Sequence, residues 1–592
     1  MNARSQGARA GEARVRAPLA AACLAATALA AGLLAAGPAV GGNTADDAND
    51  DRPNIVVVMA DDQDSASMRV MSRVNEQLGG QGTTFANNFV NFSLCCPSRS
   101  TFLTGQYAHN HGVLGNQPPE GGFSKLDSSN TLPLWLQQAG YYTGHVGKYL
   151  NGYEDVTPSI VPPGWTEWYG TTQTYAYYGY QLNENGTIVD YGTTADEYQA
   201  DVFTRKAVDF VNRRAPDSQP FFLSVAYLAP HGGGPNPNPQ APANCANTAK
   251  PAPRHATAFD SEALPQPASF NEADVSDKPT RIQNLPLLEP ADVADIQRQY
   301  RCRLESILGV DEGVDSIVSA LRAQGELDET LFVYTADNGF MHGEHRIQDG
   351  KIVLYEPSIR VPLIMRGPGV PSGTTVDDMT INADLAPTIL DAANATAARV
   401  MDGESLFGAM QTPTRLSGRA LEIETGSYTA VRTQRYIYAE HTSGENTGQK
   451  ELYDLVEDPD ELQNLQADPA FDGVEAALAG LLSELRTCSG DACRQRPALK
   501  LKLDYKRDSQ NGHRCAAGAV RVIVKGDDRS LLTGAEFNVG SKAAGSDSSA
   551  PFRARIKPGA LKKRGKSRLG ATASLLDGRV MTLVEKKVRR CR

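Results

Sequence analysis

The sequence predicts an α/β protein with a largely parallel central sheet and smaller β-rich parts toward its C-terminus. Short, unbroken apolar runs rich in Val and Phe are typical of strands that are buried on both faces of a sheet. Segments with apolar residues at helical spacing lie between these runs, and strands that alternate with helices indicate a parallel sheet. Polar residues follow directly after the runs, at the edge of the sheet where ligands bind in such folds.

The N-terminal segment predicts export from the cell. Four arginines within the first 16 residues precede an Ala- and Leu-rich run over residues 17–36, and Gly37-Pro38-Ala39 follows. This order is typical of a secretory signal peptide, which we place at residues 1–42, with a flexible polar leader at 43–52. An uncleaved membrane anchor is the alternative, because the run is nearly long enough to cross a bilayer. The abundance of Ala and the small residues that follow favour cleavage, so we expect a secreted protein, extracellular or in the cell envelope, with no stable membrane span.

Four apolar runs are predicted to form strands of the central sheet. They are Asn54–Met59, Tyr142–Val146, Phe221–Tyr227 and Leu331–Tyr334, the last continued by Thr335-Ala336. After them come, in the same order, Asp61-Asp62, Gly147-Lys148, Ala229-Pro230-His231 and Asp337-Asn338-Gly339. A helix is predicted over Gln297–Gln324, where apolar residues recur at helical spacing. We assign these elements to one large domain, residues 53–415.

Cysteines occur along the whole chain, and the large domain contains one long excursion. Nine cysteines are present, and eight remain if Cys23 leaves with the signal peptide. Export favours disulfides. The candidate pairs are Cys245–Cys302, Cys488–Cys493 and Cys515–Cys591, although spacing alone does not fix the pairing. The segment Gly232–Lys278, rich in Pro, Asn and Ala, is predicted to be a surface excursion over the active site, held by Cys245 if this residue pairs with Cys302.

Two smaller parts follow the large domain. From about Leu421 the pattern changes to short strands and turns, and Ala470–Arg486 is predicted to be a helix, so we assign residues 416–487 to a C-terminal α+β subdomain. Residues 496–592 alternate strand patterns, such as Val520–Val524 and Val580–Val584, with Gly and charge clusters. This pattern favours a small added domain similar to a β-sandwich.

Charge is unevenly distributed along the chain. The composition, 41% hydrophobic and 21% charged, excludes a disordered or fibrous protein, and the net charge is −11. Residues 496–592 contain 24 Lys and Arg against 8 Asp and Glu, which leaves −27 for the rest of the chain. Basic residues cluster at Arg553–Arg568 and Lys586–Arg592. This basic tail indicates an anionic polymer as partner, with a merely solvated surface as the alternative, and we expect no nucleic acid.

The segment Cys95-Cys96-Pro97-Ser98-Arg99 combines a nucleophile with a predicted helix start. Pro97 suits the first turn of a helix, which would place Cys95 at the positive end of the helix dipole, where anions bind. Arg99 would lie one turn further on, able to hold an anion or a charged nucleophile. A buried cysteine pair or a vicinal disulfide is the alternative without chemistry.

This segment, followed by Leu103-Thr104-Gly105, resembles the signature of the sulfatase family, whose first cysteine is oxidised to formylglycine by a formylglycine-generating enzyme. The resemblance extends from Asn54 to about Leu465. Its further motifs are Gly147-Lys148-Tyr149-Leu150-Asn151, Pro162-Pro163-Gly164-Trp165, Asp337-Asn338-Gly339, Lys351 with Tyr355-Glu356, and Glu451-Leu452-Tyr453-Asp454-Leu455. The details most resemble the branch of N-acetylglucosamine-6-sulfatases and heparan 6-O-endosulfatases. The resemblance implies the alkaline-phosphatase-like α/β fold, one calcium ion, and a sulfated carbohydrate substrate with 6-O-sulfated glucosamine, as in a glycosaminoglycan.

The residues themselves also predict a cation site. Asp61, Asp62, Asp337 and Asn338 offer only oxygen ligands, which suit a hard ion such as Ca²⁺ better than zinc. Taken separately, either pair is explained by a turn or a helix cap. The resemblance implies one Ca²⁺ per chain and adds position 95 to its ligands.

The resemblance also implies roles for three further residues. Lys148 and Lys351 would line the sulfate pocket and neutralise charge that develops as the S–O bond breaks. His231 would contact the sulfate ester and protonate the departing alcohol. A hydroxyl of hydrated formylglycine, supported by Arg99, would attack sulfur.

One position departs from the family pattern. Many sulfatases have a histidine two residues after the lysine that Lys148 matches, and this chain has Leu150 there. The base that expels sulfate is therefore unassigned, with His109, His111 and Asn151 as candidates. The alternative functions are a phosphonate- or phosphate-ester hydrolase of the same superfamily and a catalytically dead polysaccharide-binding surface protein. The complete set of nucleophile, metal and lysine residues argues against a dead enzyme.

Overall fold

The computed structural model of the chain describes residues 51–591, except 157–158, 235–242, 413 and 511–512. The predicted signal peptide and all but the end of the predicted leader lie outside the described residues. In the described part of the chain, no helix is both long and apolar enough to cross a membrane.

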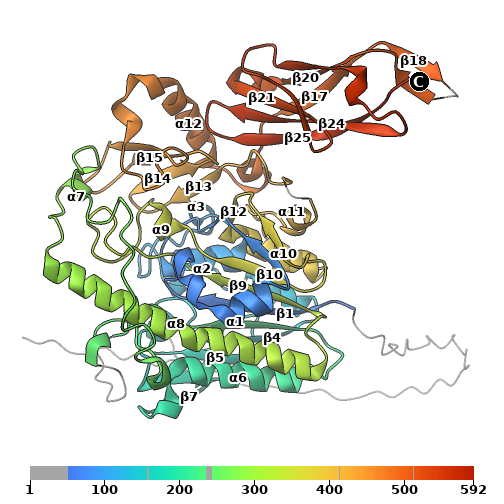
Figure 1. Cartoon of the computed structure of the whole chain (residues 1–592). Coiled ribbons are helices and arrows are strands. Elements are labelled where there is room, and N and C mark those ends of the chain that lie inside the picture. Colours follow the sequence, from blue (N-terminus) through green and yellow to red (C-terminus); the bar gives the residue numbers. More distant parts are fainter. Residues whose placement is uncertain (1–50, 157–158, 235–242, 413, 511–512, 592) are drawn as a thin grey trace, which may run out of the picture. The chain divides into compact units, whose positions relative to one another are not determined.

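A ten-stranded sheet forms the centre of the large domain (Figure 1), in the order β11-β2-β10-β9-β1-β8-β4-β5-β6-β7. The strands, in chain order, are β1 (Asn54–Ala60), β2 (Thr83–Phe85), β4 (Tyr142–Gly147), β5 (Glu167–Thr171), β6 (Tyr180–Glu184), β7 (Thr187–Tyr191), β8 (Phe221–Ala226), β9 (Thr330–Ala336), β10 (Leu363–Arg366) and β11 (Thr374–Val376). The middle strands β9, β1, β8, β4 and β5 pair in parallel, whereas β10, β6 and β7 pair antiparallel to their neighbours. The four predicted strands and the largely parallel sheet are thereby confirmed.

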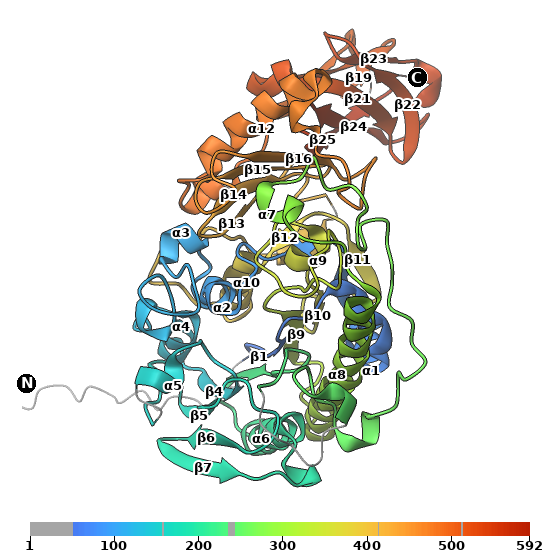
Figure 2. The same cartoon turned by 90° about the vertical axis from the view of Figure 1, so that its left-hand side faces the viewer.

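Different helices cover the two faces of this sheet (Figure 2). Strand β1 shows why its sequence is apolar after Asn54: Val56 and Val58 point into one hydrophobic cluster, and Ile55 and Val57 into the other. The covering helices are α6 (Gln199–Arg214) and α8 (Pro290–Gln324) on one face, and α2 (Cys95–Thr104), α4 (Leu132–Gln138) and α10 (Leu385–Ala392) on the other. Each large apolar side chain buried in this way contributes about 1.5–3 kcal/mol.

Helix α8 is longer than the sequence predicts, because it begins at Pro290 and not at Gln297. Proline is well suited to a first helical turn, and the side chain of Asp292 accepts from the backbone N–H of Glu289. The helix ends before Gly325, whose φ of 82° is favourable for glycine. The added turns carry Val293 and Ile296, and Ile296 is buried in a small separate cluster with Tyr300 and Leu304, so the apolar pattern does extend to them.

The C-terminal subdomain is an antiparallel sheet with one long helix. Its strands β13 (Leu421–Glu424), β14 (Tyr428–Arg432), β15 (Tyr436–His441) and β16 (Lys450–Asp454) pair in sequence order, and α12 (Asp472–Leu485) shares their hydrophobic cluster. Three disulfides form as predicted, between Cys245 and Cys302, Cys488 and Cys493, and Cys515 and Cys591. The first ties the predicted excursion to α8. The remaining short elements are α1 (Ser72–Val74), α3 (Ala108–His111), α5 (Tyr153–Val156), α7 (Thr280–Gln283), α9 (Glu356–Ile359), α11 (Phe407–Gln411), β3 (Asn88–Phe89) and β12 (Thr380–Ile381).

Two sheets form the last part of the chain (Figure 1, red). One has the order β17-β20-β23 and the other β22-β21-β24-β25, and a hairpin of β18 and β19 is added. Their bounds are β17 (Leu499–Asp504), β18 (Arg507–Gln510), β19 (His513–Ala516), β20 (Val520–Gly526), β21 (Leu532–Val539), β22 (Lys542–Asp547), β23 (Arg553–Ile556), β24 (Lys566–Leu575) and β25 (Val580–Arg589). Leu501 and Val522 from the first sheet share one core with Phe537 and Leu569 from the second. This is the arrangement of a small β-sandwich, whereas the exact domain boundaries stay predictions.

Candidate active site

Two adjacent strands end at the same level, which brings the polar residues after them together. In the parallel pairing of β1 with β9, Ala60 lies opposite Ala336, so Asp61-Asp62 and Asp337-Asn338 leave the sheet side by side. Asp62 has a φ of 62°, in the left-handed region that residues with side chains rarely adopt. Its backbone N–H donates to Asp337 Oδ1 at 3.0 Å, which links the two strand ends.

Helix α2 begins at Cys95 beside these strand ends. Leu94 precedes it in an extended conformation, and Pro97 lies in the first turn as predicted. Cys95 Sγ lies 3.5 Å from Asp61 Oδ1 and 2.9 Å from Lys351 Nζ. Cys95 and Cys96 are both free and buried, so no vicinal disulfide forms. The candidate nucleophile therefore lies between a carboxylate and an ammonium group.

Two lysines pair with the aspartates that follow β1. Lys148 forms an ion pair with Asp61, and Lys351 forms one with Asp62. All four side chains are largely or fully buried. Removing such charges from water is costly, and the pairing compensates much of that cost.

Arg99 joins the same cluster from one turn inside α2. Its Nε donates to Asp337 Oδ2 at 2.8 Å, and its Nη2 lies 3.4 Å from Asp61 Oδ2. Its Nη1 donates to the backbone oxygen of Lys148 at 2.7 Å. The guanidinium thus fixes the positions of two carboxylates and of the chain that carries Lys148.

The charges around Cys95 control its protonation. Burial alone would raise the pKa of Asp61, but Lys148, His231 and Arg99 outweigh it and hold the pKa well below the usual range. Burial and the Asp61 charge raise the pKa of the Cys95 thiol to about 12. An unmodified Cys95 is therefore a neutral thiol at physiological pH, which is a poor nucleophile.

The acidic cluster fits a hard divalent cation. The described part of the chain has three groups of possible ligand atoms that lie within 4.8 Å of one another, and one of them comes from Asp61, Asp62, Cys95 and His231. Asn338 Nδ2 donates to Asp62 Oδ1 at 2.7 Å, and Asn338 Oδ1 is turned toward Lys351 Nζ at 3.5 Å. The carboxylates and the amide of Asn338 offer oxygen ligands, which Ca²⁺ prefers, whereas Cys95 offers a sulfur atom and His231 a nitrogen atom.

His231 presents one ring nitrogen to the cluster. Its Nδ1 lies 2.6 Å from the backbone oxygen of Gly232, and its Nε2 lies 3.4 Å from Asp62 Oδ2. Because a carbonyl oxygen only accepts, Nδ1 carries the proton and Nε2 faces the site. Burial lowers the pKa of His231, even though Asp62 and Asp61 act in the opposite direction.

Tyr175 is a site residue that the sequence does not indicate. Its ring stacks on His231, with ring centroids 4.9 Å apart and planes at 24°. Lys148 Nζ lies 5.2 Å from the centroid of the same ring, and Asn151 Nδ2 donates to its hydroxyl at 2.7 Å. Because 38% of Tyr175 is exposed, it offers part of an aromatic ring to solvent beside Lys148 and His231.

Arg303 of α8 is a second residue that sequence reasoning missed. Its Nη1 donates to the backbone oxygen of Pro230 at 2.9 Å, and its Nη2 to that of Asp62. Its guanidinium lies 3.8 Å from the centroid of the Phe340 ring. It holds the two backbone segments that carry Asp62 and His231. A charged residue within an apolar helical face is the signal that could have revealed it.

The three candidate bases lie in different surroundings. His109 Nδ1 lies 3.0 Å from Glu424 Oε1, and burial, which would lower its pKa, is outweighed by Glu422 and Glu424, which raise it to about 11. His111 Nε2 lies 3.0 Å from Thr101 Oγ1, and burial lowers its pKa to about 3. Neither set of partners belongs to the cluster around position 95. Of the three candidates, the described contacts connect Asn151 to the site, through the Tyr175 hydroxyl.

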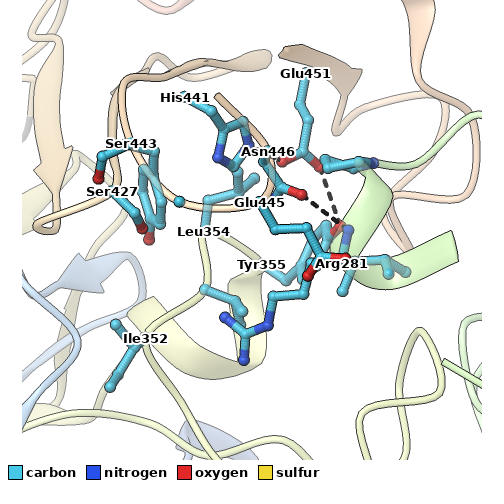
Figure 3. Close-up of a pocket in the computed structure, with 15 residues that line it drawn as sticks. Arg281, Ile352, Leu354, Tyr355, Ser427, His441, Ser443, Glu445, Asn446 and Glu451 are labelled. Atoms are coloured by element: carbon cyan, nitrogen blue, oxygen red, sulfur yellow. Dashed lines mark hydrogen bonds and ion pairs between the residues drawn. The ribbon is translucent and has the colours of Figure 1, made fainter. Parts of the chain in front are cut away.

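The motif Tyr355-Glu356 contacts the distant motif Glu451–Leu455 through a hydrogen bond to Glu451. The Tyr355 hydroxyl donates to Glu451 Oε2 at 3.0 Å, the Tyr453 hydroxyl to the same oxygen at 2.8 Å, and His441 Nε2 lies 2.8 Å from Glu451 Oε1. Tyr355, His441 and Glu451 line a cavity of about 160 Å³ (Figure 3). Glu451 therefore anchors the segment 351–355, which begins with Lys351 and ends with Tyr355.

Comparison with known families and proteins gives consistent matches. The profile of the family described as Sulfatase matches residues 53–395, and that of the N-sulphoglucosamine sulphohydrolase C-terminal region matches residues 343–488. An N-acetylglucosamine-6-sulfatase of Capra hircus is 31% identical over 498 residues, which cover 75% of this chain and 85% of the relative. An arylsulfatase of Volvox carteri is 32% identical over 500 residues, which cover 75% of this chain and 76% of the relative. An extracellular sulfatase Sulf-1 homologue of Caenorhabditis elegans is 34% identical over 365 residues, which cover 60% of this chain and only 49% of that relative.

Solved structures share the fold. A structure described as a complex with its substrate D-glucosamine-2-N,6-O-disulfate has a TM-score of 0.61 at 24% identity, and covers 74% of this chain and 97% of that chain. A phosphonate monoester hydrolase of Agrobacterium radiobacter has a TM-score of 0.56 at 22% identity, and covers 74% of this chain and 95% of that chain. At these identities the likeness concerns the fold alone.

Proposed function

Because the chain belongs to the sulfatase family and has its alkaline-phosphatase-like α/β fold, we propose that it hydrolyses sulfate esters with a nucleophile formed from Cys95. The observation that supports this best is the buried cluster at the start of α2. Cys95 lies there within contact distance of Asp61 and Lys351, beside the end of β9. The start of a helix, together with the ammonium group of Lys351, suits a small tetrahedral anion.

The proposed reactive form of residue 95 is formylglycine, made by a formylglycine-generating enzyme, which supplies a hydrated aldehyde hydroxyl that attacks sulfur. The unmodified thiol is unsuited to this role, because its pKa is raised to about 12. Lys351 and the first turn of α2 present positive charge at position 95, where the sulfate group would bind. Lys148, which pairs with the other oxygen of the Asp61 carboxylate, would neutralise charge that develops in the transition state.

The proposed metal is one Ca²⁺, held by Asp61, Asp62, Asp337, Asn338 and residue 95. When bound, Ca²⁺ supplies Lewis-acid charge beside the nucleophile. Arg99 orients Asp337 and Asp61 for this purpose, and Arg303 holds the backbone of Asp62. Both arginines are therefore positioning residues for the cation site.

His231 is the proposed general acid. Its Nε2 faces the site, and Gly232 and the ring of Tyr175 fix its orientation. Burial lowers its pKa, so protonation at neutral pH requires an added negative charge nearby. The sulfate group of a bound substrate supplies that charge, which raises the pKa of an adjacent imidazole.

The proposed substrate is a 6-O-sulfated glucosamine, alone or within a glycosaminoglycan. Relatives named N-acetylglucosamine-6-sulfatase support this choice at 31% identity. The exposed ring of Tyr175 provides a flat apolar surface on which a sugar can stack. We further propose that the protein acts outside the cytoplasm, as relatives named extracellular sulfatases suggest.

Neighbouring cysteines allow a matched test of the nucleophile. The Cys95→Ala variant should lose essentially all turnover of p-nitrophenyl sulfate, because it lacks the covalent nucleophile. The Cys96→Ala variant removes a buried thiol from the adjacent position and should retain turnover. Equal activity of the two variants would exclude Cys95 as the nucleophile.

The substrate class needs two further comparisons. Wild-type enzyme should cleave p-nitrophenyl sulfate faster than the corresponding phenylphosphonate, and the reverse order would favour the phosphonate-ester hydrolase. Within a panel of 2-O-, 3-O-, 4-O-, 6-O- and N-sulfated sugars, the 6-O-sulfated glucosamine should be cleaved fastest. A preference for aryl sulfates over every sugar in the panel would contradict the carbohydrate assignment.

A further inference from the structure

The C-terminal β-sandwich contains a groove of about 600 Å³. We call it the basic groove, because most of its lining side chains are positively charged. These are Lys500, Lys502, Arg507, Lys525, Lys586 and Lys587. They come from β17, β20 and β25 and from the start of the β18 hairpin, so the fold gathers residues that are up to 87 positions apart in the sequence.

Strand pairing explains how these charges converge. Along β17 the side chain of Leu501 is buried in the core, whereas Lys500 and Lys502 are exposed. Lys500 lies directly opposite Lys525 in the pairing of β17 with β20. Like charges in opposite positions destabilise a sheet, so folding alone does not favour this pair.

The lysines of the basic groove lack acidic partners. Lys500, Lys502, Lys525, Lys586 and Lys587 form no ion pair within the part of the chain that the structure describes. Other basic residues of the same domain are paired: Arg521 lies 3.2 Å from Asp504 and Arg568 lies 3.8 Å from Glu585. The basic groove therefore concentrates uncompensated charge in a hollow, which favours an anionic ligand.

The surroundings of the basic groove suit a polymer more than a single ion. A second hollow of about 690 Å³ adjoins it at Lys587, which lines both. Arg415 adds positive charge to the second hollow, in which Arg568 is paired with Glu585. Positive charge thus extends over two adjoining hollows, which matches a chain with repeating negative groups.

We propose that the basic groove binds a sulfated polysaccharide chain and so holds the enzyme on polymeric substrate; the choice of polyanion rests on the proposed function. Lysine ammonium groups are compact point charges that can pair with sulfate groups spaced along such a chain. Tyr505 also lines the groove and supplies an aromatic surface for a sugar ring, with the Arg507 guanidinium 5.7 Å from its ring centroid. Nucleic acid is the competing polyanion.

Two triple variants of the full-length chain separate the basic groove from total charge. The groove variant replaces Lys500, Lys525 and Lys586 with Gln. The control variant replaces Lys562, Lys563 and Lys566 with Gln. These three lysines are exposed in the same domain and do not line the groove, so the control removes the same net charge. Binding of a fluorescent heparin oligosaccharide is measured between 50 and 200 mM salt, together with turnover of p-nitrophenyl sulfate.

The groove variant should bind heparin about tenfold more weakly at low salt, and the slope of log affinity against log salt should fall by about 2, as expected for three lost contacts to a single-stranded polyanion. The control variant should stay within about twofold of wild type, and both variants should keep wild-type turnover, because these lysines lie outside the cluster at Cys95. Equal losses in the two variants would overturn the proposal, since total charge would then explain binding. Tighter binding of a single-stranded DNA of equal charge would also overturn it. Absence of turnover in the wild-type enzyme would instead contradict the proposed function, and the heparin comparison would still test the groove.

Discussion

Replacing Lys351 with Met should remove most of the turnover and leave the cation site intact. Lys351 Nζ lies 2.9 Å from Cys95 Sγ, so the ammonium group is close to where sulfate would react. A unit charge about 4 Å from the reacting group contributes about 4 kcal/mol at an effective dielectric constant of 20. The loss of one stabilising group in a buried site commonly lowers kcat about 10²- to 10³-fold. We therefore expect kcat to fall by this factor.

Two measurements on the same variant separate charge neutralisation from damage to the metal site. Steady-state kinetics with p-nitrophenyl sulfate give kcat, and calorimetry gives the affinity for Ca²⁺. The affinity should stay equal or increase, because Lys351 competes with a cation for Asp62. As a control, Lys206→Met removes a lysine of α6 that pairs with Glu184 of β6, and it should leave both values unchanged.

Two results would refute this reasoning. If kcat of the Lys351→Met variant stays within about threefold of wild type, the lysine does not stabilise the transition state. If kcat and the Ca²⁺ affinity fall together, Lys351 shapes the cation site and does not act on the sulfate group.

Three further changes test other parts of the account. Asp337→Asn should weaken Ca²⁺ binding at least about tenfold, measured by calorimetry. It should also remove the rise in melting temperature that added Ca²⁺ produces, measured by thermal melting with and without chelator. Wild-type affinity would exclude Asp337 as a ligand. Glu451→Gln replaces charge-assisted hydrogen bonds by neutral ones and should cost about 2–3 kcal/mol in unfolding free energy and lower kcat/KM. The control Glu484→Gln changes an exposed residue of α12 and should alter neither value. Equal stability of the two variants would show that the Glu451 carboxylate does not anchor the segment 351–355. Burial raises the pKa of Glu305 from 4.5 to about 7, so the stability that its protonated form provides is complete below pH 4.5 and is lost as the pH rises through 7. Glu305→Gln should therefore melt at a higher temperature than wild type at pH 8 but not at pH 4, and an equal difference at both values would contradict the titration.

The central sheet could be predicted because its strands are buried on both faces. Residues Ile55–Met59 must be apolar throughout, since their side chains enter two hydrophobic clusters in alternation. The first turns of α8 were not included in the predicted helix, although Val293 and Ile296 continue its apolar pattern; Ile296 packs in a small cluster apart from the two clusters of the sheet. Burial on both faces, and not helix propensity, is what makes the sequence informative here.

The predicted site residues gather because they follow adjacent strands or begin a helix at the same edge. Asp61 and Asp337 could be placed from the strand order, whereas the approach of Lys351 to Cys95 depends on a long connection that only the structure shows. Tyr175 lies in a loop without periodic pattern, so nothing in the sequence indicates that it covers His231. Tertiary structure decides such contacts.

The basic tail shows the same limit. The sequence indicated clusters at Arg553–Arg568 and Lys586–Arg592, yet the first cluster does not line the basic groove. Alternation along β17 and its register with β20 bring Lys500 and Lys525 together instead. Charge counts predict that a domain is basic, and strand pairing determines where its charges converge.

The chemical form of residue 95 tests the central claim most directly. Trypsin should release Val74–Arg99, because no Lys or Arg lies between Val74 and Arg99. In active enzyme purified from its own organism, mass spectrometry should show this peptide about 18 Da lighter than the cysteine form, as expected when the Cys95 thiol is oxidised to an aldehyde. Fully active enzyme with unmodified cysteine at position 95 would contradict the proposed mechanism.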